Sequence, residues 1–428
     1  MNENALRALS AAELAGRLQQ RTITAEAVVR AFQNRIAERE PEVQAWTALA
    51  GAKAIAYAQV LDRGPITGPL HGLPLGVKDL FDTADLPASY GSPIYADNQP
   101  ASDAAPVALA RAAGAVVMGK TVTTEFATYQ AGPTHNPHHL DHTPGGSSSG
   151  SAAAVADRMV PLAFGTQTAG SIIRPASYCG VVGFKPSFGY LTRAGVKSLA
   201  ETLDTVGGFG SSVEDVGLLM GALSGDPRLG ARTLDGSPRI GFYFDESWDQ
   251  TLPETRAAVE QAQKVLALAG ARVSDVKAPA ACVGLAQAHV DVMAYEASRA
   301  LAYEWGAHRG QLSAGLVQML EVGSAMTYEQ YRDRKDTAAL GGRAMQAVFK
   351  DYDLLLAPSA AGVAPLKVQG TGDPLFCRSW SLLGLPCVHL PFATGPVGLP
   401  VGLQAVGAWG DDGRTLGFAR WVLGRLLG

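Results

Sequence analysis

Short apolar runs alternate along the chain with segments whose apolar residues follow helical spacing. The runs are three to five residues long, which is typical of buried strands and too short for helices. They occupy residues 75–77, 115–118, 160–164, 240–244 and 354–356. This alternation predicts an α/β sandwich whose sheet is largely parallel, because parallel strands are joined by helical crossovers.

Several helices are marked by their caps. A capping box at residues 10–13 and apolar residues at helical spacing after Thr24 predict two helices ahead of the sheet. A further helix is expected over residues 254–269, because Gly270 stops it, and a longer one over 327–350, which opens with a capping box. Residues from about 283 to 326, between these last two helices, also follow helical order, so they are expected to form core-facing helices.

The composition indicates a large folded protein. Of the 428 residues, 47% are hydrophobic and 17% are charged, which allows a sizeable core. The formal net charge of −4 leaves no basic stripe for phosphate backbones, so nucleic acid is not an expected partner. No run of about 18 uncharged apolar residues occurs, and Glu3 and Glu13 lie where a signal peptide carries cations, so no membrane partner is expected and the location is expected to be cytoplasmic. Four cysteines without a CxxC pair fit a reducing compartment: Cys179, Cys282, Cys377 and Cys387.

Small residues dominate the chain between Gly145 and Gly189, where backbone can approach backbone or ligand closely. Residues 143–151 read Thr-Pro-Gly-Gly-Ser-Ser-Ser-Gly-Ser, and residues 165–175 read Gly-Thr-Gln-Thr-Ala-Gly-Ser-Ile-Ile-Arg-Pro. Both segments resemble the amidase signature family, whose hallmark is a Gly-Gly-Ser-Ser-Gly/Ser-Gly block followed by a Gly-Ser turn that carries the nucleophile. Further blocks resemble that family in its own order, at residues 72–79, 119–126, 183–187, 203–207 and 399–404. The resemblance covers most of the chain.

The resemblance implies a Ser-Ser-Lys catalytic triad. Ser171 matches the family's nucleophile, Ser147 its bridging serine and Lys78 its base. A serine hydroxyl attacks well only when a nearby group takes its proton, and a lysine can take it only when neutral. Burial beside the apolar strand 75–77 would lower the lysine pKa from about 10.4 and meet that requirement. The family also holds the bridging serine through a cis peptide, here between Gly146 and Ser147.

Residues 168–171 resemble the family's oxyanion loop. Backbone N–H groups at Thr168, Ala169 and Gly170 would face the negative oxygen that develops during acyl transfer. Many family members carry Asp-Thr-Gly-Gly-Ser here, whereas this chain has Gln167 and Ala169. The loop therefore cannot rely on torsions that only glycine adopts at residue 169.

Arg174 lies three residues after Ser171, whereas many relatives place an arginine two residues after the nucleophile. Two interpretations stay open for its side chain. The guanidinium either grips a substrate carboxylate with two hydrogen bonds or forms a buried structural ion pair, which is the commoner role.

Four histidines cluster ahead of the first small-residue segment, at His135, His138, His139 and His142. They lie in a proline-containing loop without the regular spacing and the additional ligand types that zinc sites use. The cluster is therefore interpreted as a loop at the rim of the site, and no metal is expected.

The family resemblance implies an α/β fold class, as a single three-layer α/β/α sandwich around a large mixed sheet. One amidase signature domain is expected over residues 1–428, with N-terminal helices in 1–60 and a helical variable segment at about 245–350 that shapes the substrate pocket. The implied function is a serine hydrolase that cleaves an amide or carbamate (urethane) bond through an acyl-enzyme on Ser171, with linear amides as substrates and esterase or urethanase side activity. The expected partners are a small-molecule amide or carbamate and water, without a cofactor, and a homodimer is left open.

Two other functions stay open as alternatives. The glutaminase subunit of a tRNA-dependent amidotransferase shares the same signature and would require partner subunits. Residues 114–121 match the P-loop pattern of nucleotide-binding proteins, but residues 107–113 read as a helix and 115–118 as a strand, which is the wrong context for a phosphate loop. A Ser-x-x-Lys pattern at 274–277 falls in an apparent strand, where residues three apart face opposite sides, and is set aside.

Overall fold

One mixed sheet of eleven strands forms the centre of the protein in the computed structural model, which describes residues 1–226, 229 and 237–428. The strand order is β1-β3-β2-β4-β6-β5-β10-β11-β9-β7-β8. The strands are β1 Trp46–Leu49, β2 Pro74–Lys78, β3 Val116–Thr121, β4 Leu162–Gln167, β5 Val182–Lys185, β6 Thr205–Gly210, β7 Arg239–Phe244, β8 Arg272–Lys277, β9 Leu354–Pro358, β10 Cys387–Thr394 and β11 Pro400–Val406. Every apolar run that predicted a strand contributes to one of them.

The sheet is less parallel than the apolar pattern predicts. β2 runs parallel to β3 and β4, and β7 runs parallel to β8 and β9. The other six pairings between described strands are antiparallel. The expectation of a largely parallel sheet is therefore wrong, because an apolar run reports that a strand is buried and carries no information about its direction. The mixed sheet implied by the family resemblance is confirmed.

The helices begin and end close to the predicted caps. Ser10 and Thr327 each form a complete capping box, and the helix over 253–268 ends just before Gly270. The longer helices are α1 Glu3–Ala8, α2 Ala11–Gln19, α3 Ala25–Val43, α4 Ala52–Arg63, α5 Ala105–Ala112, α6 Ser149–Ala156, α7 Ile173–Cys179, α8 Val213–Ser224, α10 Pro253–Leu268, α11 Leu285–Ala300, α12 Ala302–His308, α13 Ala314–Ala325, α14 Tyr328–Asp351, α15 Leu375–Leu382 and α16 Asp412–Leu426. Their bounds match the expected helices after Thr24 and Thr327 closely.

The N-terminal region departs from the expectation of two helices. Three helices, α1 to α3, precede β1, and α4 follows it. β1 is only four residues long and pairs antiparallel with β3 at the edge of the sheet. So short an edge strand, buried at only part of its positions, leaves no clear apolar run, which is why the sequence pattern did not reveal it.

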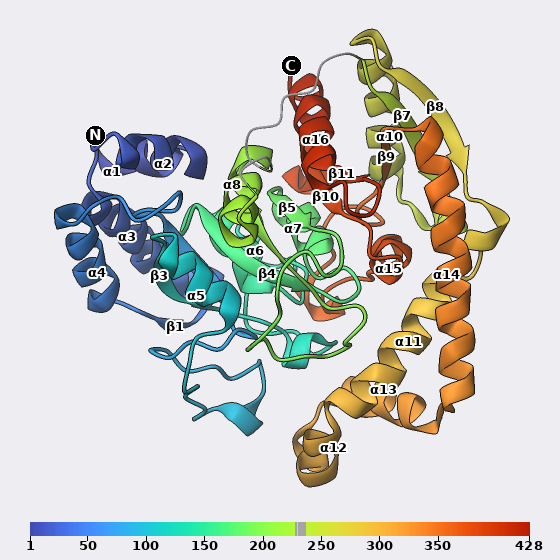
Figure 1. Cartoon of the computed structure of the whole chain (residues 1–428), viewed down its shortest axis with the longest axis horizontal. Coiled ribbons are helices and arrows are strands. Elements are labelled where there is room, and N and C mark those ends of the chain that lie inside the picture. Colours follow the sequence, from blue (N-terminus) through green and yellow to red (C-terminus); the bar gives the residue numbers. More distant parts are fainter. Residues whose placement is uncertain (227–228, 230–236) are drawn as a thin grey trace.

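Helices cover both faces of the sheet. A Cβ atom added at Gly207 of β6 would lie 2.8 Å from Ile172 at the start of α7, and one at Gly208 would lie 2.8 Å from Leu219 of α8. Successive positions of a strand face opposite sides, so α7 and α8 lie on opposite faces. Along the other direction of the molecule, α1 to α4 lie at one end and α11 to α14 at the other (Figure 1). This is the expected three-layer α/β/α arrangement.

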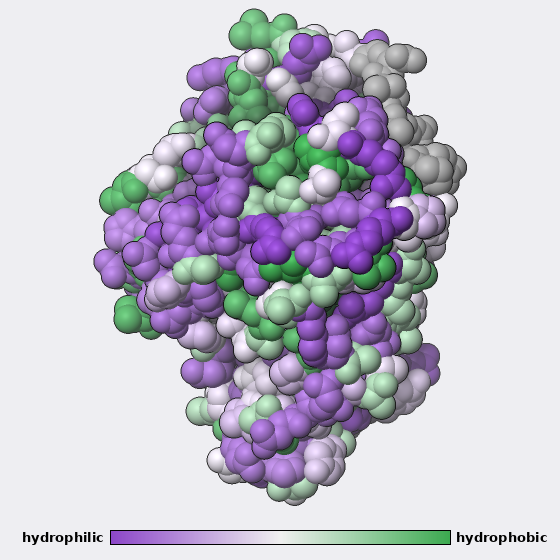
Figure 2. Space-filling model, turned by 90° about the vertical axis from the view of Figure 1, so that its left-hand side faces the viewer, coloured by the Kyte–Doolittle hydropathy of each residue, from purple (hydrophilic) through white to green (hydrophobic). Residues whose placement is uncertain are grey.

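The surface around the N-terminal helices is mainly hydrophilic, and its apolar residues form separate patches (Figure 2). Among the described helices, none combines the length and the apolar content that a membrane crossing requires. All four cysteines are buried with free thiols. They pack as small apolar side chains, as the sequence indicates.

Candidate active site

Lys78 is the last residue of β2, and its side chain is completely buried. Its Nζ lies 2.7 Å from Ser147 Oγ and 2.8 Å from Thr166 Oγ1 on the neighbouring strand β4. Burial lowers the pKa of Lys78 well below its usual range, and the negative charge of Asp204 opposes that shift only in part. The site therefore favours the neutral amine, which the chemistry of a lysine base requires.

Ser147 follows a non-proline cis peptide bond at Gly146–Ser147, as the resemblance implies. The segment reaches this position because glycines let it pass close to other backbone. Gly145 has a φ of +80°, and a Cβ there would lie 2.9 Å from Pro175 Cα. A Cβ at Gly150 would lie 2.2 Å from Ala45 O. The small residues thus seat the serine against Lys78.

Ser171 lies in the turn between β4 and α7, next to the segment that carries Ser147. Ser148 N donates a hydrogen bond to Ser171 O at 3.4 Å. The relative exposure is 5% for Ser171 and 1% for Ser147, so both serines are shielded from bulk water. Ser171 lines a cavity of about 410 Å³, and Lys78 and Ser147 are not among the residues that line it. The structure therefore brings Lys78 and Ser147 into direct contact and places the turn that carries Ser171 beside the Ser147 segment.

Gln167 occupies the place where many relatives have aspartate. Its Oε1 accepts hydrogen bonds from Ile172 N at 2.9 Å and Ile173 N at 3.0 Å, at the start of α7. The amide oxygen thus supplies the acceptor that a carboxylate would supply there. Ala169 is not among the described residues with positive φ, so an alanine fits this loop without the torsions reserved for glycine.

The backbone N–H groups of Ala169, Gly170 and Ser171 have no acceptor within the described part of the chain. Ala169 and Ser171 line the 410 Å³ cavity, and Thr168 lies beside them in its wall. Successive unpaired N–H groups at a cavity are suited to a negatively charged oxygen. This geometry is compatible with the predicted oxyanion loop.

Arg174 forms no ion pair within the described chain. Its Nη2 donates to Gly146 O at 2.7 Å, and its Nε donates to Thr371 O at 2.8 Å. Nη1 is buried without a partner among the described groups, and the residue lines the cavity. The buried ion pair that the sequence favoured is therefore wrong, because neutral carbonyls hold the guanidinium. A free donor remains at the cavity wall.

Several cavity residues lie far from the motifs in sequence. Tyr129 and the ion pair between Arg378 and Asp373, at 3.1 Å, line the cavity, as do Met293 of α11 and Met319 of α13. No local signal in the sequence marks them, because each reaches the cavity only through long-range packing. Thr166 could have been suspected, since it lies inside the segment 165–175 that carries the resemblance.

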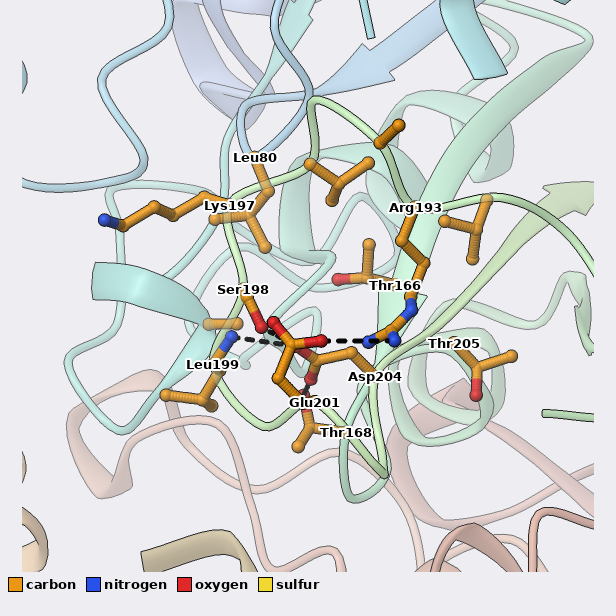
Figure 3. Close-up of a pocket in the computed structure, with 14 residues that line it drawn as sticks. Leu80, Thr166, Thr168, Arg193, Lys197, Ser198, Leu199, Glu201, Asp204 and Thr205 are labelled. Atoms are coloured by element: carbon orange, nitrogen blue, oxygen red, sulfur yellow. Dashed lines mark hydrogen bonds and ion pairs between the residues drawn. The ribbon is translucent and has the colours of Figure 1, made fainter. Parts of the chain in front are cut away.

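Figure 3 shows a second cavity, of about 330 Å³. The two share Ala127, Thr168 and Leu199 in their walls. Asp204 accepts hydrogen bonds from Thr168 Oγ1 at 2.6 Å and from Leu199 N at 2.8 Å (Figure 3). Burial raises the pKa of Asp204, and these hydrogen bonds oppose the rise. The carboxylate thus fixes the segment 198–204 next to the residue that opens the predicted oxyanion loop.

Three of the four histidines of the 135–142 cluster bind backbone carbonyls. Nδ1 of His135 lies 2.6 Å from Leu140 O, Nε2 of His138 lies 2.9 Å from Cys179 O, and Nδ1 of His142 lies 2.6 Å from Ala364 O. Within the described ranges, no three His, Cys, Asp or Glu side chains gather as metal ligands. The rings serve to pin the loop that leads into the Ser147 segment.

The two remaining motif matches lie in strands. Residues 116–121 of the P-loop match form β3, α5 precedes them, and Lys120 Nζ lies 2.8 Å from Asp79 Oδ1 with both side chains buried. A phosphate loop is therefore absent from residues 114–121, and the P-loop alternative is wrong. Ser274 lies in β8, as expected.

Comparisons with known proteins identify the family of the chain. A family model described as amidase matches residues 27–416. A glutamyl-tRNA(Gln) amidotransferase subunit of Rhodopirellula baltica is 34% identical, over 92% of this chain and 92% of its own length. A crystal structure of an amidase superposes on this chain with a TM-score of 0.89 and is 31% identical; the match covers 97% of this chain and 100% of that chain. The native peptide amidase from Stenotrophomonas maltophilia superposes with a TM-score of 0.84 and is 27% identical; the match covers 98% of this chain and 97% of that chain. The chain thus belongs to the amidase family, the carbon–nitrogen hydrolases that carry the amidase signature.

Proposed function

We propose that this chain hydrolyses an amide-type carbon–nitrogen bond by acyl transfer to Ser171, with Ser147 and Lys78 as the proton relay. The observation that carries the proposal is the 2.7 Å contact between Lys78 Nζ and Ser147 Oγ in a fully buried setting. Thr166 Oγ1, at 2.8 Å from the same amine, holds Lys78 in place. An uncharged lysine beside a serine hydroxyl is a base that needs no histidine.

The relay accounts for each proton. As Ser171 Oγ attacks the carbonyl carbon, its proton passes to Ser147 Oγ and the proton of Ser147 passes to Lys78. The negative oxygen of the tetrahedral intermediate lies against the N–H groups of Ala169 and Gly170. The reverse transfer protonates the departing amine, the carbon–nitrogen bond breaks, and an ester remains on Ser171. Water, deprotonated through the same relay, then releases the acid.

The substrate class is an amide or a carbamate that fits a cavity of about 410 Å³. Met293 and Met319 give this cavity an apolar side, and Arg174 Nη1 offers a hydrogen-bond donor without a partner among the described groups. A carboxylate on the substrate would satisfy that donor with a charge-assisted hydrogen bond, which is stronger than the bond that a neutral carbonyl accepts. A panel of amides, anilides, esters and urethanes with an amine-release readout identifies the class.

Labelling tests the nucleophile directly. Phenylmethylsulfonyl fluoride should modify Ser171 and abolish turnover, because a sulfonyl fluoride reacts with an activated serine. Mass spectrometry of a digest locates the adduct. A label on another serine, with loss of activity, would overturn the assignment of Ser171.

A second function is the glutaminase subunit of a tRNA-dependent amidotransferase. It is favoured by the identity of 34% over 92% of the chain with a protein that belongs to such an enzyme as one of its subunits. The two functions differ in their need for partners. If the purified chain alone hydrolyses simple amides rapidly, it acts by itself; if it releases ammonia from glutamine only with added partner subunits, it is a glutaminase subunit. A cytoplasmic location and a homodimer stay predictions of the sequence.

A further inference from the structure

Each of the three backbone carbonyls of residues 168–170 accepts a hydrogen bond from a group outside these residues. His289 Nε2, on α11, lies 2.9 Å from Thr168 O. Ser381 Oγ, on α15, donates a hydrogen bond to Ala169 O at 2.6 Å. Gly170 O accepts from Arg174 N at 2.9 Å. None of the three anchors belongs to residues 168–171, and two of them come from helices more than 100 residues away in sequence.

Anchored carbonyls also fix the N–H groups of the same peptide units. The described cis peptide bond is Gly146–Ser147, so the units joining residues 168–171 are trans. In a trans unit the C=O and the N–H point in opposite directions. Because Thr168 O faces His289 and Ala169 O faces Ser381, the N–H groups of Ala169 and Gly170 face the other way, where no acceptor lies within the described chain.

The hydrogen bond of His289 defines its tautomer. A carbonyl oxygen only accepts, so Nε2 carries the proton that reaches Thr168 O. The ring is completely buried, and its Nδ1 has no partner among the described groups. Burial lowers the pKa of His289 to about 4, so the ring is neutral near pH 7. A neutral donor anchors the carbonyl without placing a positive charge behind the oxyanion loop.

Ser381 is itself held by Gln167. Gln167 Nε2 donates to Ser381 Oγ at 3.0 Å, which directs the hydroxyl proton of Ser381 towards Ala169 O. The aspartate that many relatives have at this point has no proton to donate when ionised. It would accept the hydroxyl proton of Ser381 and compete with Ala169 O. Gln167 and Ser381 therefore act as a matched pair in this chain.

We propose that His289 and the pair Gln167–Ser381 are positioning residues of this enzyme, which aim the N–H groups of Ala169 and Gly170 at the oxyanion. This rests on the proposed function. The contacts give the helical segment a part in catalysis, since α11 supplies His289. The residues act on the transition state through the loop and touch neither the substrate nor the triad.

The test compares His289→Leu and Ser381→Ala with the intact chain, using the amide that the substrate panel identifies. Both variants should lower kcat by about 10- to 100-fold, below the loss typical of a deleted oxyanion donor, and leave KM within about twofold. The inhibition constant of phenylboronic acid, which forms a tetrahedral adduct with a nucleophilic serine, should rise in parallel with the loss of kcat. His289→Gln keeps a donor and should recover part of kcat.

His389 and Ser359 provide a matched control, because they are a buried histidine and a buried serine in contact at 2.7 Å and line neither cavity. His389→Gln and Ser359→Ala should change thermal stability without the parallel change in kcat and boronic acid affinity. An equal loss of kcat in these controls would overturn the positioning role. If His289→Leu does not fold, Ser381→Ala and His289→Gln decide the question.

The outcomes separate this inference from the proposed function. If Ser171→Ala keeps its turnover, the proposed function fails. If Ser171→Ala is inactive while His289→Leu and Ser381→Ala keep the kcat of the intact chain, only the positioning role fails. Labelling of Ser171 by phenylmethylsulfonyl fluoride in His289→Leu and Ser381→Ala shows that the nucleophile is still reactive in these two variants.

Discussion

The segment around the triad and the helical segment α11–α14 differ sharply in how they are packed. From residue 143 to 179, nearly every residue is buried, and glycines bring backbone within touching distance of backbone. In the 24 residues of α14, by contrast, only Gly341 and Met345 are buried. The first region has almost no room to vary, while the second can change most of its surface without disturbing a neighbour. This difference explains why the two hallmark segments of the family, 143–151 and 165–175, lie in the first region while the helical segment contains none of the family blocks.

Beside the apolar packing of α11, polar contacts hold the helical segment together and join it to the remainder of the protein. Glu296 of α11 accepts hydrogen bonds from Thr202 N at 2.8 Å and from Tyr331 OH at 2.8 Å. Lys335 Nζ donates to Thr202 Oγ1 at 2.8 Å, and Glu125 accepts from Ser313 N. The same segment places two methionines in the cavity wall. The triad thus lies outside the helical segment, which contributes to the cavity wall and contacts the loop 168–171 through His289, so the two regions can be tested by separate substitutions.

The largest effect should come from the nucleophile in the tightly packed region. Ser171→Ala is expected to lower kcat by about 10⁴- to 10⁶-fold, as loss of a nucleophile does in other serine hydrolases. Ser149→Ala is the control, since Ser149 is a buried serine of the same tightly packed region and its Oγ donates a hydrogen bond to Val122 O at 3.4 Å. The rate of amine release, measured for both variants and for the intact chain, gives the two values of kcat to be compared. A Ser149→Ala variant as inactive as Ser171→Ala would mean that any disturbance of this packing stops turnover.

The second prediction concerns the pH profile. Lys78 must be neutral to act, and burial holds its pKa well below the usual range, so activity should fall as the pH drops and the amine gains a proton. Between about pH 5 and 9, the profile of kcat/KM for the intact chain should therefore show an acid limb. A flat profile over that window would contradict a lysine base.

Lys78→Met should remove that limb and lower kcat/KM by about 10³-fold or more, because no base remains. Lys185→Met is the matched control. Lys185 is also completely buried, but its Nζ donates to Pro186 O at 3.0 Å and it lines neither cavity. The control variant should keep the acid limb of the intact chain.

The sequence predicted the two regions to different degrees. Caps and periodicity placed α2, α10 and α14, because those signals are local. The triad was found through short segments whose small residues permit close approach. The directions of the strands and the existence of β1 were not predicted, because neither produces a periodic pattern of apolar residues in the sequence. The contact between His289 and Thr168 joins residues 121 positions apart, so no local sequence pattern could have predicted it.

A smaller effect is expected at the boundary between the two regions, where Arg174 meets the cavity. Arg174→Ala removes the hydrogen bond to Gly146 O and should slow all substrates. If the free Nη1 also binds a substrate carboxylate, carboxylated amides should lose about 10- to 100-fold more kcat/KM than neutral amides of the same length. Equal losses of kcat/KM on both kinds of amide would show that Arg174 does not bind the substrate carboxylate.

The smallest effect belongs to the helical segment. Tyr331→Phe removes the hydrogen bond to Glu296 and should lower the free energy of unfolding by about 1 kcal/mol, seen as a fall of about 1–2 °C in Tm. Tyr328→Phe is the control, because its side chain is 65% exposed and the change should leave Tm in place. Turnover of both variants should stay within about twofold of the intact chain, since neither residue lines the cavities. A large loss of kcat in Tyr331→Phe with an unchanged Tm would show that this attachment controls the chemistry as well, and the two regions would then act as one.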